Sequence, residues 1–98
     1  MSHADISVIV PVYRGARHLG QAIASVLGQS HGALELLVVD DASPDDSAGV
    51  VKSFDDRRLR YLRHETNRGA NAARNTGIRA ASAPIVAFLD QDDWFHAD

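Results

Sequence analysis

Three carboxylates lie close together near the end of the chain: Asp90, Asp92 and Asp93, in the sequence DQDDW. They follow directly after the apolar run IVAFL, residues 85–89. If that run is a strand and continues, Asp90 and Asp92 project to the same side, with Cα atoms about 6.6 Å apart. This separation is wide for two ligands of one ion. We therefore expect a division of labour, in which one carboxylate binds a divalent metal and the other takes a hydroxyl or a metal-bound water.

A cluster of carboxylates needs a compensating cation. Mg²⁺ and Mn²⁺ prefer oxygen ligands, and they often bind through one or two carboxylates together with substrate phosphates. The cluster therefore predicts a metal-diphosphate site at the end of a buried strand. Any one of these aspartates taken alone is equally well explained as a turn former or a helix N-cap, so the prediction depends on the group.

Four apolar runs predict strands, at residues 6–12, 34–39, 59–62 and 85–89. The first, second and fourth are nearly continuous in Val, Ile and Leu, which is typical of strands covered on both faces of a parallel sheet. The third run is interrupted by arginine and indicates an edge strand.

Helical patterns separate the runs. Residues 18–27 carry an apolar stripe at helical spacing, and its members are Leu19, Ile23, Val26 and Leu27. In the next interval Ser43 resembles an N-cap, with Pro44 at the first helical position and Asp46 closing a capping-box-like pair. The third pattern, residues 69–82, is rich in small residues and could lie close to a sheet.

The resulting order, β-α-β-α-β-α-β, predicts an α/β fold with a Rossmann-like parallel sheet and helices on both faces. Ligands of such sheets bind at the carboxyl ends of the strands. Tyr13 follows the first strand, Asp40 and Asp41 follow the second, and Asp90 follows the fourth. The polar chemistry is therefore expected at one edge of the sheet.

Composition removes several function classes. The 98 residues suit one domain, and a net charge of -3 gives no overall attraction to nucleic acid. Cysteine is absent, which excludes disulfides and thiolate metal sites. No apolar run approaches the roughly 20 residues of a membrane helix, and we expect a cytoplasmic chain. The turn PVYRGARHLG lacks the G-x-G-x-x-G pattern of dinucleotide oxidoreductases. The five histidines show no metal-ligand spacing and are expected to be structural.

Four segments together resemble a known family: SVIVPVYRGARHLGQAIASVLGQS, ELLVVDDASPDDS, NRGANAARNTGIRAA and IVAFLDQDDW. The chain is similar to the nucleotide-binding N-terminal half of inverting family-2 glycosyltransferases, over residues 6–94. The resemblance implies a truncated glycosyltransferase A-type fold. Residues 1–98 would form a single donor-binding segment, with the acceptor half absent from this chain.

The resemblance also implies roles for individual residues. Pro11 and Tyr13 would frame the nucleobase, with the Tyr13 ring stacked on it. Asp41 would accept a hydrogen bond from the base edge, usually uracil in this family. Arg74 would lie near the nucleotide.

The acidic cluster takes its roles from the same resemblance. Asp90 would sit beside the ribose and the metal, with Asp90 also the second candidate for a metal ligand. Asp92 would bind the Mn²⁺ or Mg²⁺ that bridges the diphosphate. Asp93 and Trp94 would complete the pattern. Ala97 departs from it, because the family usually has a proline at this point.

The implied function is metal-assisted transfer of a sugar, with inversion, from a nucleoside diphosphate sugar to an acceptor hydroxyl. UDP-sugar is the first candidate donor, and the catalytic base is expected beyond Asp98.

The acceptor, a saccharide, lipid or protein, would bind the missing half, and the full-length protein could be membrane-associated. The alternative is a non-catalytic nucleotide-sugar binding module; a reading frame without a later carboxylate would favour it. An uncovered sheet edge could also allow self-association, which sedimentation at several concentrations would detect.

Overall fold

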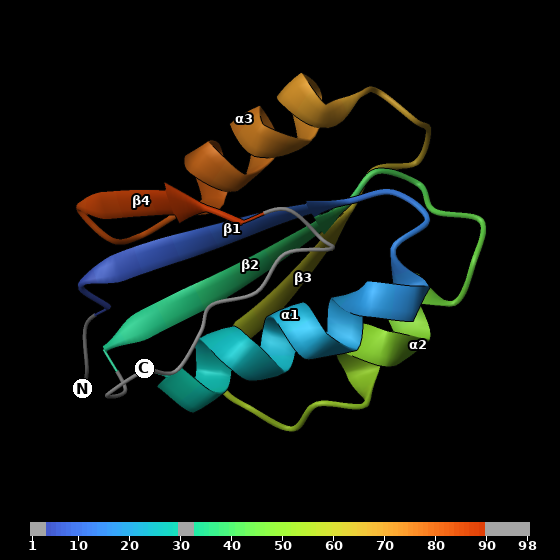
Figure 1. The fold of residues 1–98 in the computed structure, drawn as a ribbon. Coiled ribbons are helices and arrows are strands. Elements are labelled where there is room, and N and C mark those ends of the chain that lie inside the picture. Colours follow the sequence, from blue (N-terminus) through green and yellow to red (C-terminus); the bar gives the residue numbers. More distant parts are fainter. Residues whose placement is uncertain (1–3, 30–32, 90–98) are drawn as a thin grey trace.

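The computed structural model describes residues 4–29 and 33–89, and its elements alternate along the chain (Figure 1). In order they are β1 (Ile6–Val12), α1 (Ala16–Gln29), β2 (Leu34–Asp40), α2 (Ser47–Lys52), β3 (Leu59–Arg63), α3 (Ala70–Ala80) and β4 (Ile85–Phe88). The predicted α/β class and the element order are both confirmed. None of the helices within the described ranges is long and apolar enough to cross a membrane.

The four strands form one sheet in the order β3-β2-β1-β4, and every neighbouring pair is parallel. β1 and β2 occupy the centre and are buried along nearly their whole length. β3, the run with interspersed arginines, lies at an edge as predicted. Asp40, the last residue of β2, is level with Val12 of β1 and Arg63 of β3. The carboxyl ends of the three strands therefore reach the same edge.

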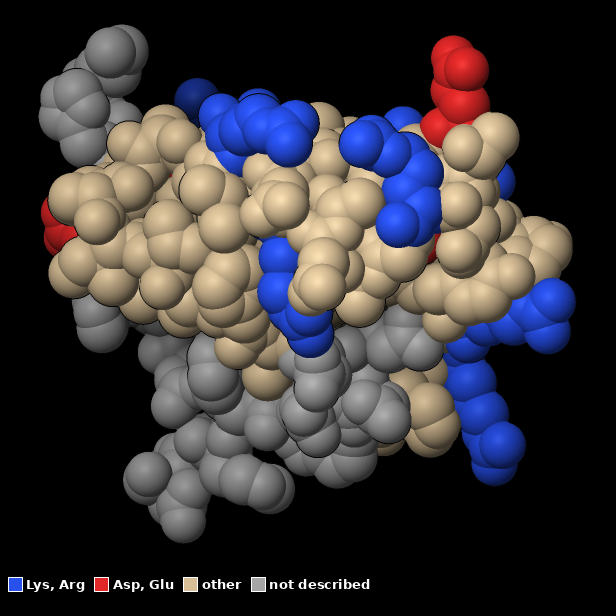
Figure 2. Space-filling view, turned by 90° about the horizontal axis from the view of Figure 1, so that it is seen from above, with Lys and Arg blue, Asp and Glu red and all other residues tan. Residues whose placement is uncertain are grey.

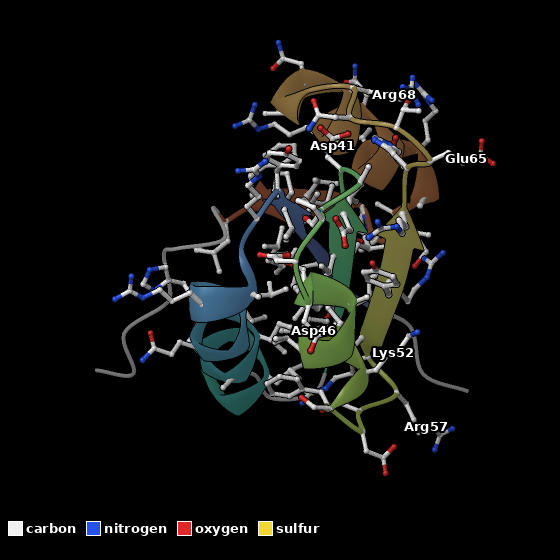
Figure 3. All side chains as sticks on the ribbon, turned by 90° about the vertical axis from the view of Figure 1, so that its right-hand side faces the viewer. Asp41, Asp46, Lys52, Arg57, Glu65 and Arg68 are labelled. Atoms are coloured by element: carbon white, nitrogen blue, oxygen red, sulfur yellow. The ribbon has the colours of Figure 1, made fainter. Side chains whose placement is uncertain are left out.

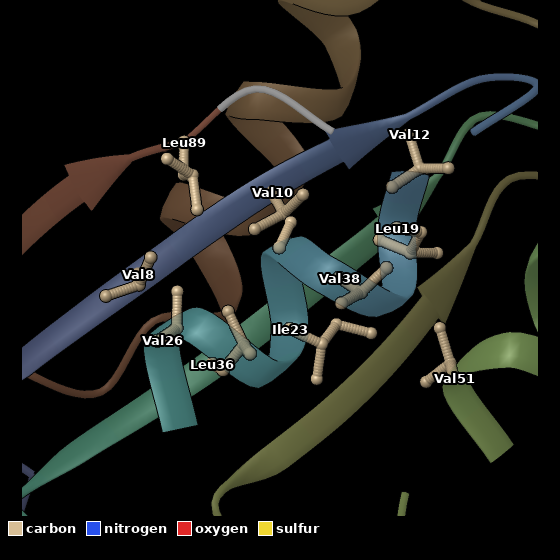
Figure 4. Close-up of a cluster of buried hydrophobic side chains, with 11 residues drawn as sticks. Val8, Val10, Val12, Leu19, Ile23, Val26, Leu36, Val38, Val51 and Leu89 are labelled. Carbon is tan, nitrogen blue, oxygen red and sulfur yellow. The ribbon is translucent and has the colours of Figure 1, made fainter. Parts of the chain in front are cut away.

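Helices cover the two faces of this sheet separately, with α1 and α2 on one face and α3 on the other (Figure 1). Alternate residues of β1 and β2 point to opposite faces, so each face receives its own apolar cluster. The larger cluster combines β1 and β2 with α1 (Figure 4). It includes Val8, Val10, Leu36 and Val38 from the strands and Leu19, Ile23 and Val26 from α1. The smaller cluster, under α3, consists of Ile9, Leu37, Val39 and Ala73.

The apolar stripe predicted for the first helix is confirmed. Leu19, Ile23 and Val26 are fully buried, and Leu27 packs at the border of the cluster. The helix extends two residues beyond the predicted stripe at each end.

The predicted start of the second helix is wrong. α2 begins at Ser47, and the Ser43 hydroxyl accepts a hydrogen bond from the backbone N–H of Arg14 instead of capping the helix. Asp46 takes the N-cap position without a side-chain hydrogen bond to the helix. Asp45 accepts hydrogen bonds from the N–H and hydroxyl of Ser47. Contacts with the neighbouring β1–α1 loop therefore override the local capping pattern.

The fourth strand also departs from expectation. Its run of apolar residues predicted burial on both faces, yet Ile85 is 58% exposed and Phe88 is 46% exposed. β4 pairs with β1 at one side only, and no described strand lies at its other side. Only Leu89, which follows the strand, is buried, and its side chain joins the α1 cluster (Figure 4).

A buried polar cluster ties α3 to the amino ends of the central strands. Glu35 of β2 accepts hydrogen bonds from the Ser7 hydroxyl at 2.6 Å and from both the N–H and hydroxyl of Ser82. Arg60 of β3 donates to the other carboxylate oxygen at 3.2 Å and to the carbonyl of Ala80. Burial alone would raise the pKa of Glu35, but these hydrogen bonds outweigh it and lower the pKa to about 2.

Gly77 sets how closely α3 approaches the sheet. A methyl group at this position would come within 2.5 Å of Cγ2 of Ile9, which is fully buried. We expect Gly77→Ala to lower the free energy of unfolding by about 1–2 kcal/mol, because overpacking outweighs the better helix propensity of alanine. Urea denaturation measures this. Gly28→Ala is the matched control in α1, where the added methyl group would meet no described atom within 4 Å outside its own helix, and we expect it to stabilise by about 0.5 kcal/mol. Equal effects would contradict close packing at Gly77.

The Glu35 cluster predicts a specific loss of stability in acid. The pKa of Glu35 is lowered from 4.5 to about 2 on folding, so its contribution is complete above pH 4.5 and lost as the pH falls toward 2. Between pH 6 and pH 3 the wild-type chain should lose about 2 kcal/mol more than Glu35→Gln. Urea midpoints across this range provide the measurement. Exposed Glu65→Gln should follow the wild type; parallel curves for Glu35→Gln and the wild type would contradict the prediction.

Candidate functional site

The candidate site lies where the β1–α1, β2–α2 and β3–α3 loops meet at the carboxyl ends of the strands. Figure 3 looks onto this end, with Asp41 close to the segment that carries Arg68 and with Asp46 at the start of α2. Two consecutive aspartates, Asp40 and Asp41, are buried here at the end of β2. Their side chains point to opposite faces of the sheet, as the strand alternation requires.

Asp40 is a structural residue. Its fully buried carboxylate accepts hydrogen bonds from the Tyr61 hydroxyl at 2.6 Å and from Arg63 at 2.9 Å, both on β3. It also accepts the backbone N–H of Ser43 at 2.8 Å. Arg63 also donates a hydrogen bond to the Ser43 carbonyl at 3.0 Å. Asp40 therefore fixes the start of the β2–α2 loop to the edge strand.

On the other side of the sheet, Asp41 binds the segment between β3 and α3. Its carboxylate accepts the backbone N–H of Arg68 at 2.8 Å and that of Gly69 at 2.7 Å, and His64 Nδ1 lies 2.7 Å from the same Oδ1 that Arg68 contacts. Burial opposes ionisation of Asp41, but the hydrogen bonds from His64 and the two amides lower its pKa overall. Asp41 is therefore held as an anion at the carboxyl end of β2.

His64 is the residue that sequence reasoning missed. Its ring is buried between Asp41 and Thr76 of α3, whose hydroxyl lies 2.7 Å from Nε2. Its backbone N–H donates to the Asp40 carbonyl and so prolongs the pairing of β3 with β2. A signal for it was present, because His64 directly follows the third strand and the carboxyl-end rule applies to that strand too.

The β1–α1 and β2–α2 loops are joined directly. The Ser43 hydroxyl accepts the N–H of Arg14 at 3.0 Å, and the Asp45 carboxylate accepts the N–H of Ala16 at 3.2 Å. Arg14 and Ala42 both have positive φ, 55° and 63°, a conformation that costs a non-glycine residue about 1–2 kcal/mol. These hydrogen bonds hold the strained turns, so the rim of the site is rigidly shaped.

Two predicted residues lie on β1 and its loop. Pro11 is within the strand, opposite Val39, and is half-buried. Tyr13 follows the strand and is 40% exposed, with the Arg14 guanidinium carbon 5.3 Å from its ring centroid. A partly exposed ring beside a cation is a suitable platform for stacking a flat group.

The α3 side of the site is basic. From residue 66 to residue 89 the chain contains Arg68, Arg74 and Arg79 and no acidic residue. Figure 2, which looks down on α3, shows basic side chains spread over this face. Arg74 is half-buried and donates to Asn71 within the helix at 3.2 Å. Gly69 precedes the helix with φ of 96°, which presents its N–H to Asp41.

The predicted metal ligands Asp90 and Asp92, with Asp93, lie outside the described residues. The last described residue, Leu89, donates its N–H to the Ile9 carbonyl of central β1 at 3.0 Å, so the chain is anchored to the sheet immediately before Asp90. Among residues 4–29 and 33–89 no group of three acidic or histidine side chains could hold a metal ion. The predicted ligands stand in the DQDD segment, whose carboxylate oxygens have suitable chemistry for a hard cation.

The family model that matches this chain describes glycosyltransferases, and the curated relatives compared below are named as glycosyltransferases. The family model for glycosyl transferase family 2 matches residues 7–98. UDP-Glc:alpha-D-GlcNAc-diphosphoundecaprenol beta-1,3-glucosyltransferase WfgD of Escherichia coli is 42% identical over 88 residues, covering 90% of this chain and 35% of that protein. The chain spans only 13–16% of the length of four other curated relatives that it matches.

Solved structures share the fold. The structure of S. aureus TarS 1-349 in complex with UDP-GlcNAc superposes with a TM-score of 0.89 at 30% identity, over 99% of this chain and 28% of that chain. Mannosyltransferase PcManGT from Pyrobaculum calidifontis, in complex with GDP-Man and Mn²⁺, has a TM-score of 0.85 at 29% identity, over 97% of this chain and 29% of that chain.

The link between the two loops generates a prediction for Ser43. Ser43→Ala should leave the Arg14 N–H without its acceptor and lower the free energy of unfolding by about 1–2 kcal/mol. Amide hydrogen exchange at Arg14 should accelerate, which is the specific measurement. Ser53 follows α2, and among the described residues its exposed hydroxyl donates only to the Val50 carbonyl of that helix. Ser53→Ala should therefore change stability by less than about 0.5 kcal/mol. Unchanged protection of Arg14 in Ser43→Ala would disprove the link.

Proposed function

Since the chain belongs to glycosyltransferase family 2, matched over residues 7–98, we propose that it is the donor-binding part of an enzyme that transfers a sugar from a nucleoside diphosphate sugar to an acceptor hydroxyl. The observation that carries the proposal is the buried, ionised Asp41 at the carboxyl end of β2. Its three hydrogen bonds from described residues leave about one of the four acceptor positions of a carboxylate for a ligand.

The nucleobase would lie between Tyr13 and Asp41. The partly exposed Tyr13 ring would stack on the base, and the Asp41 carboxylate would accept an N–H from its edge. Uracil and guanine both offer such an N–H. We take UDP-sugar as the donor, because UDP-GlcNAc is bound in the TarS structure and UDP-Glc stands in the name of the E. coli relative. GDP-Man in the mannosyltransferase marks guanosine as the competing choice.

The diphosphate would meet positive charge from two sources. Arg74, half-buried on the basic α3 side, would lie near the nucleotide. Asp92, with Asp90 as the second ligand, would hold Mn²⁺ or Mg²⁺, which would neutralise the charge that develops on the leaving diphosphate. Mn²⁺ bound in the mannosyltransferase structure supports this choice of cofactor.

The proposed reaction is a single displacement. The acceptor oxygen attacks the anomeric carbon while the bond to the nucleoside diphosphate breaks, and a general base takes the hydroxyl proton. Inversion follows from attack opposite the leaving group. The name of the E. coli relative supports this, since the sugar of UDP-Glc is α-linked and the named product is β-1,3. We expect the base and the acceptor platform beyond Asp98; a non-catalytic binding module is the alternative if no such base exists.

Calorimetric titration with UDP tests the donor site. The purified chain should bind UDP in the presence of Mn²⁺, and chelation of the metal should weaken binding at least about tenfold. Asp92→Ala should cause a similar loss because it removes the proposed metal ligand. Asp55→Ala, an exposed carboxylate at the opposite end of β3, should bind as the wild type does.

Two results would contradict parts of the proposal. Absence of UDP binding by a folded sample would remove the donor site from this chain. Sugar transfer by residues 1–98 at a rate typical of complete enzymes would show that the general base lies within them.

A further inference from the structure

Behind Asp41 lies a chain of buried hydrogen bonds that the proposed function does not use. Asp41 Oδ1 lies 2.7 Å from His64 Nδ1, and His64 Nε2 lies 2.7 Å from Thr76 Oγ1. All three side chains come from different parts of the fold: the end of β2, the residue after β3, and the middle of α3. The imidazole is therefore held at both of its nitrogens.

The chemistry of these groups fixes where the protons lie. An ionised carboxylate only accepts hydrogen bonds, so His64 must carry its proton on Nδ1 in either protonation state. In the neutral ring Nε2 then accepts the Thr76 hydroxyl proton. Asp41 thus selects the tautomer, and Thr76 holds the other ring nitrogen and so helps to fix the plane of the ring. Its helix cannot easily shift, because the neighbouring Gly77 packs against Ile9.

We propose that His64 and Thr76 are positioning residues that hold Asp41 as an anionic acceptor and thereby make the site select uracil over cytosine. The inference rests on the proposed donor site. The polarity of the hydrogen bond to N3 decides which base fits. Uracil presents a donor at N3, whereas cytosine presents a lone pair at N3, so a fixed anionic acceptor binds the first and repels the second.

Because Asp41 is buried, its ionised form has to be stabilised by hydrogen bonds. Its burial raises the pKa and favours the neutral acid, which could donate to cytosine. Donation by His64, together with the amides of Arg68 and Gly69, reverses that tendency. The two amides belong to the backbone and are present in every variant. His64 is the one side-chain donor to the Asp41 carboxylate among the described residues, because Asn67 donates to the backbone carbonyl of Asp41, so His64 is the group through which substitution can change selectivity.

Paired variants separate the two nitrogens of the ring. His64→Asn can place an amide N–H near the position of Nδ1 and keep donation to Asp41, while His64→Gln places its amide near Nε2 and loses that donation. Thr76→Val removes the hydroxyl at nearly constant shape, and Thr76→Ser restores it. Dissociation constants for UDP and CDP, measured calorimetrically with Mn²⁺, give a selectivity ratio for each variant. Urea denaturation of the same samples gives their stability.

We expect His64→Gln to lower the UDP/CDP selectivity ratio about tenfold, near the lower end for loss of a hydrogen bond to a charged group. Thr76→Val should lower it about threefold, because the bond it removes is to His64 and not to the carboxylate, and such a bond is worth less. His64→Asn and Thr76→Ser should recover most of the ratio. If His64→Gln does not fold, the Thr76 pair decides the question alone.

The outcomes distinguish this inference from the proposed function. If the wild type binds UDP but Thr76→Val keeps its UDP/CDP ratio while losing stability, His64 and Thr76 only support the fold and the inference is wrong. Equal affinity of the wild type for UDP and CDP also overturns it, leaving the donor site intact. If a folded wild type binds neither nucleotide, the donor site itself fails, and the inference with it.

Discussion

The alternation of side chains at the end of β2 is the constraint on which this end of the molecule depends. Two adjacent aspartates must leave the strand on opposite faces. Asp40 goes to the α2 side and binds Tyr61, Arg63 and the N–H of Ser43. Asp41 goes to the α3 side and binds His64 and the amides before α3. One dipeptide thus anchors the loops of both layers, and exchanging the two roles would require a one-residue slip of a central strand.

The hydrogen bonds at this edge make a frame around the buried Asp41 carboxylate. Strained turns at Arg14 and Ala42 persist because Ser43 and Asp45 bind the backbone of the neighbouring loop. Such a frame would suit the proposed recognition of a base edge, because a fixed acceptor discriminates better than a mobile one. At the opposite end of the central strands Glu35 joins Ser7, Ser82 and Arg60.

β4 has exposed apolar side chains, and this chain matches only a small fraction of its relatives' length. Ile85 and Phe88 lie at a sheet edge whose other side has no described neighbour. The superposition with TarS covers nearly all of this chain but 28% of the other. In a protein of that larger size, further elements could cover such an edge, as parallel sheets normally require. The described part of the chain is thus well packed in its interior and least covered at β4.

Sequence alone determined the element order, the parallel sheet, the edge position of β3 and the apolar stripe of α1, because periodicity and strand composition are local signals. The sequence also predicted, through the carboxyl-end rule, that Tyr13 and Asp41 lie at the same edge of the sheet. Only the tertiary structure decided what Ser43 and His64 do. Ser43 left its expected cap because an amide from another loop competes for its hydroxyl. His64 gained its position beside Asp41 because β3 pairs with β2 and α3 packs above them. Both outcomes depend on partners 12 to 29 residues away, which no local pattern specifies.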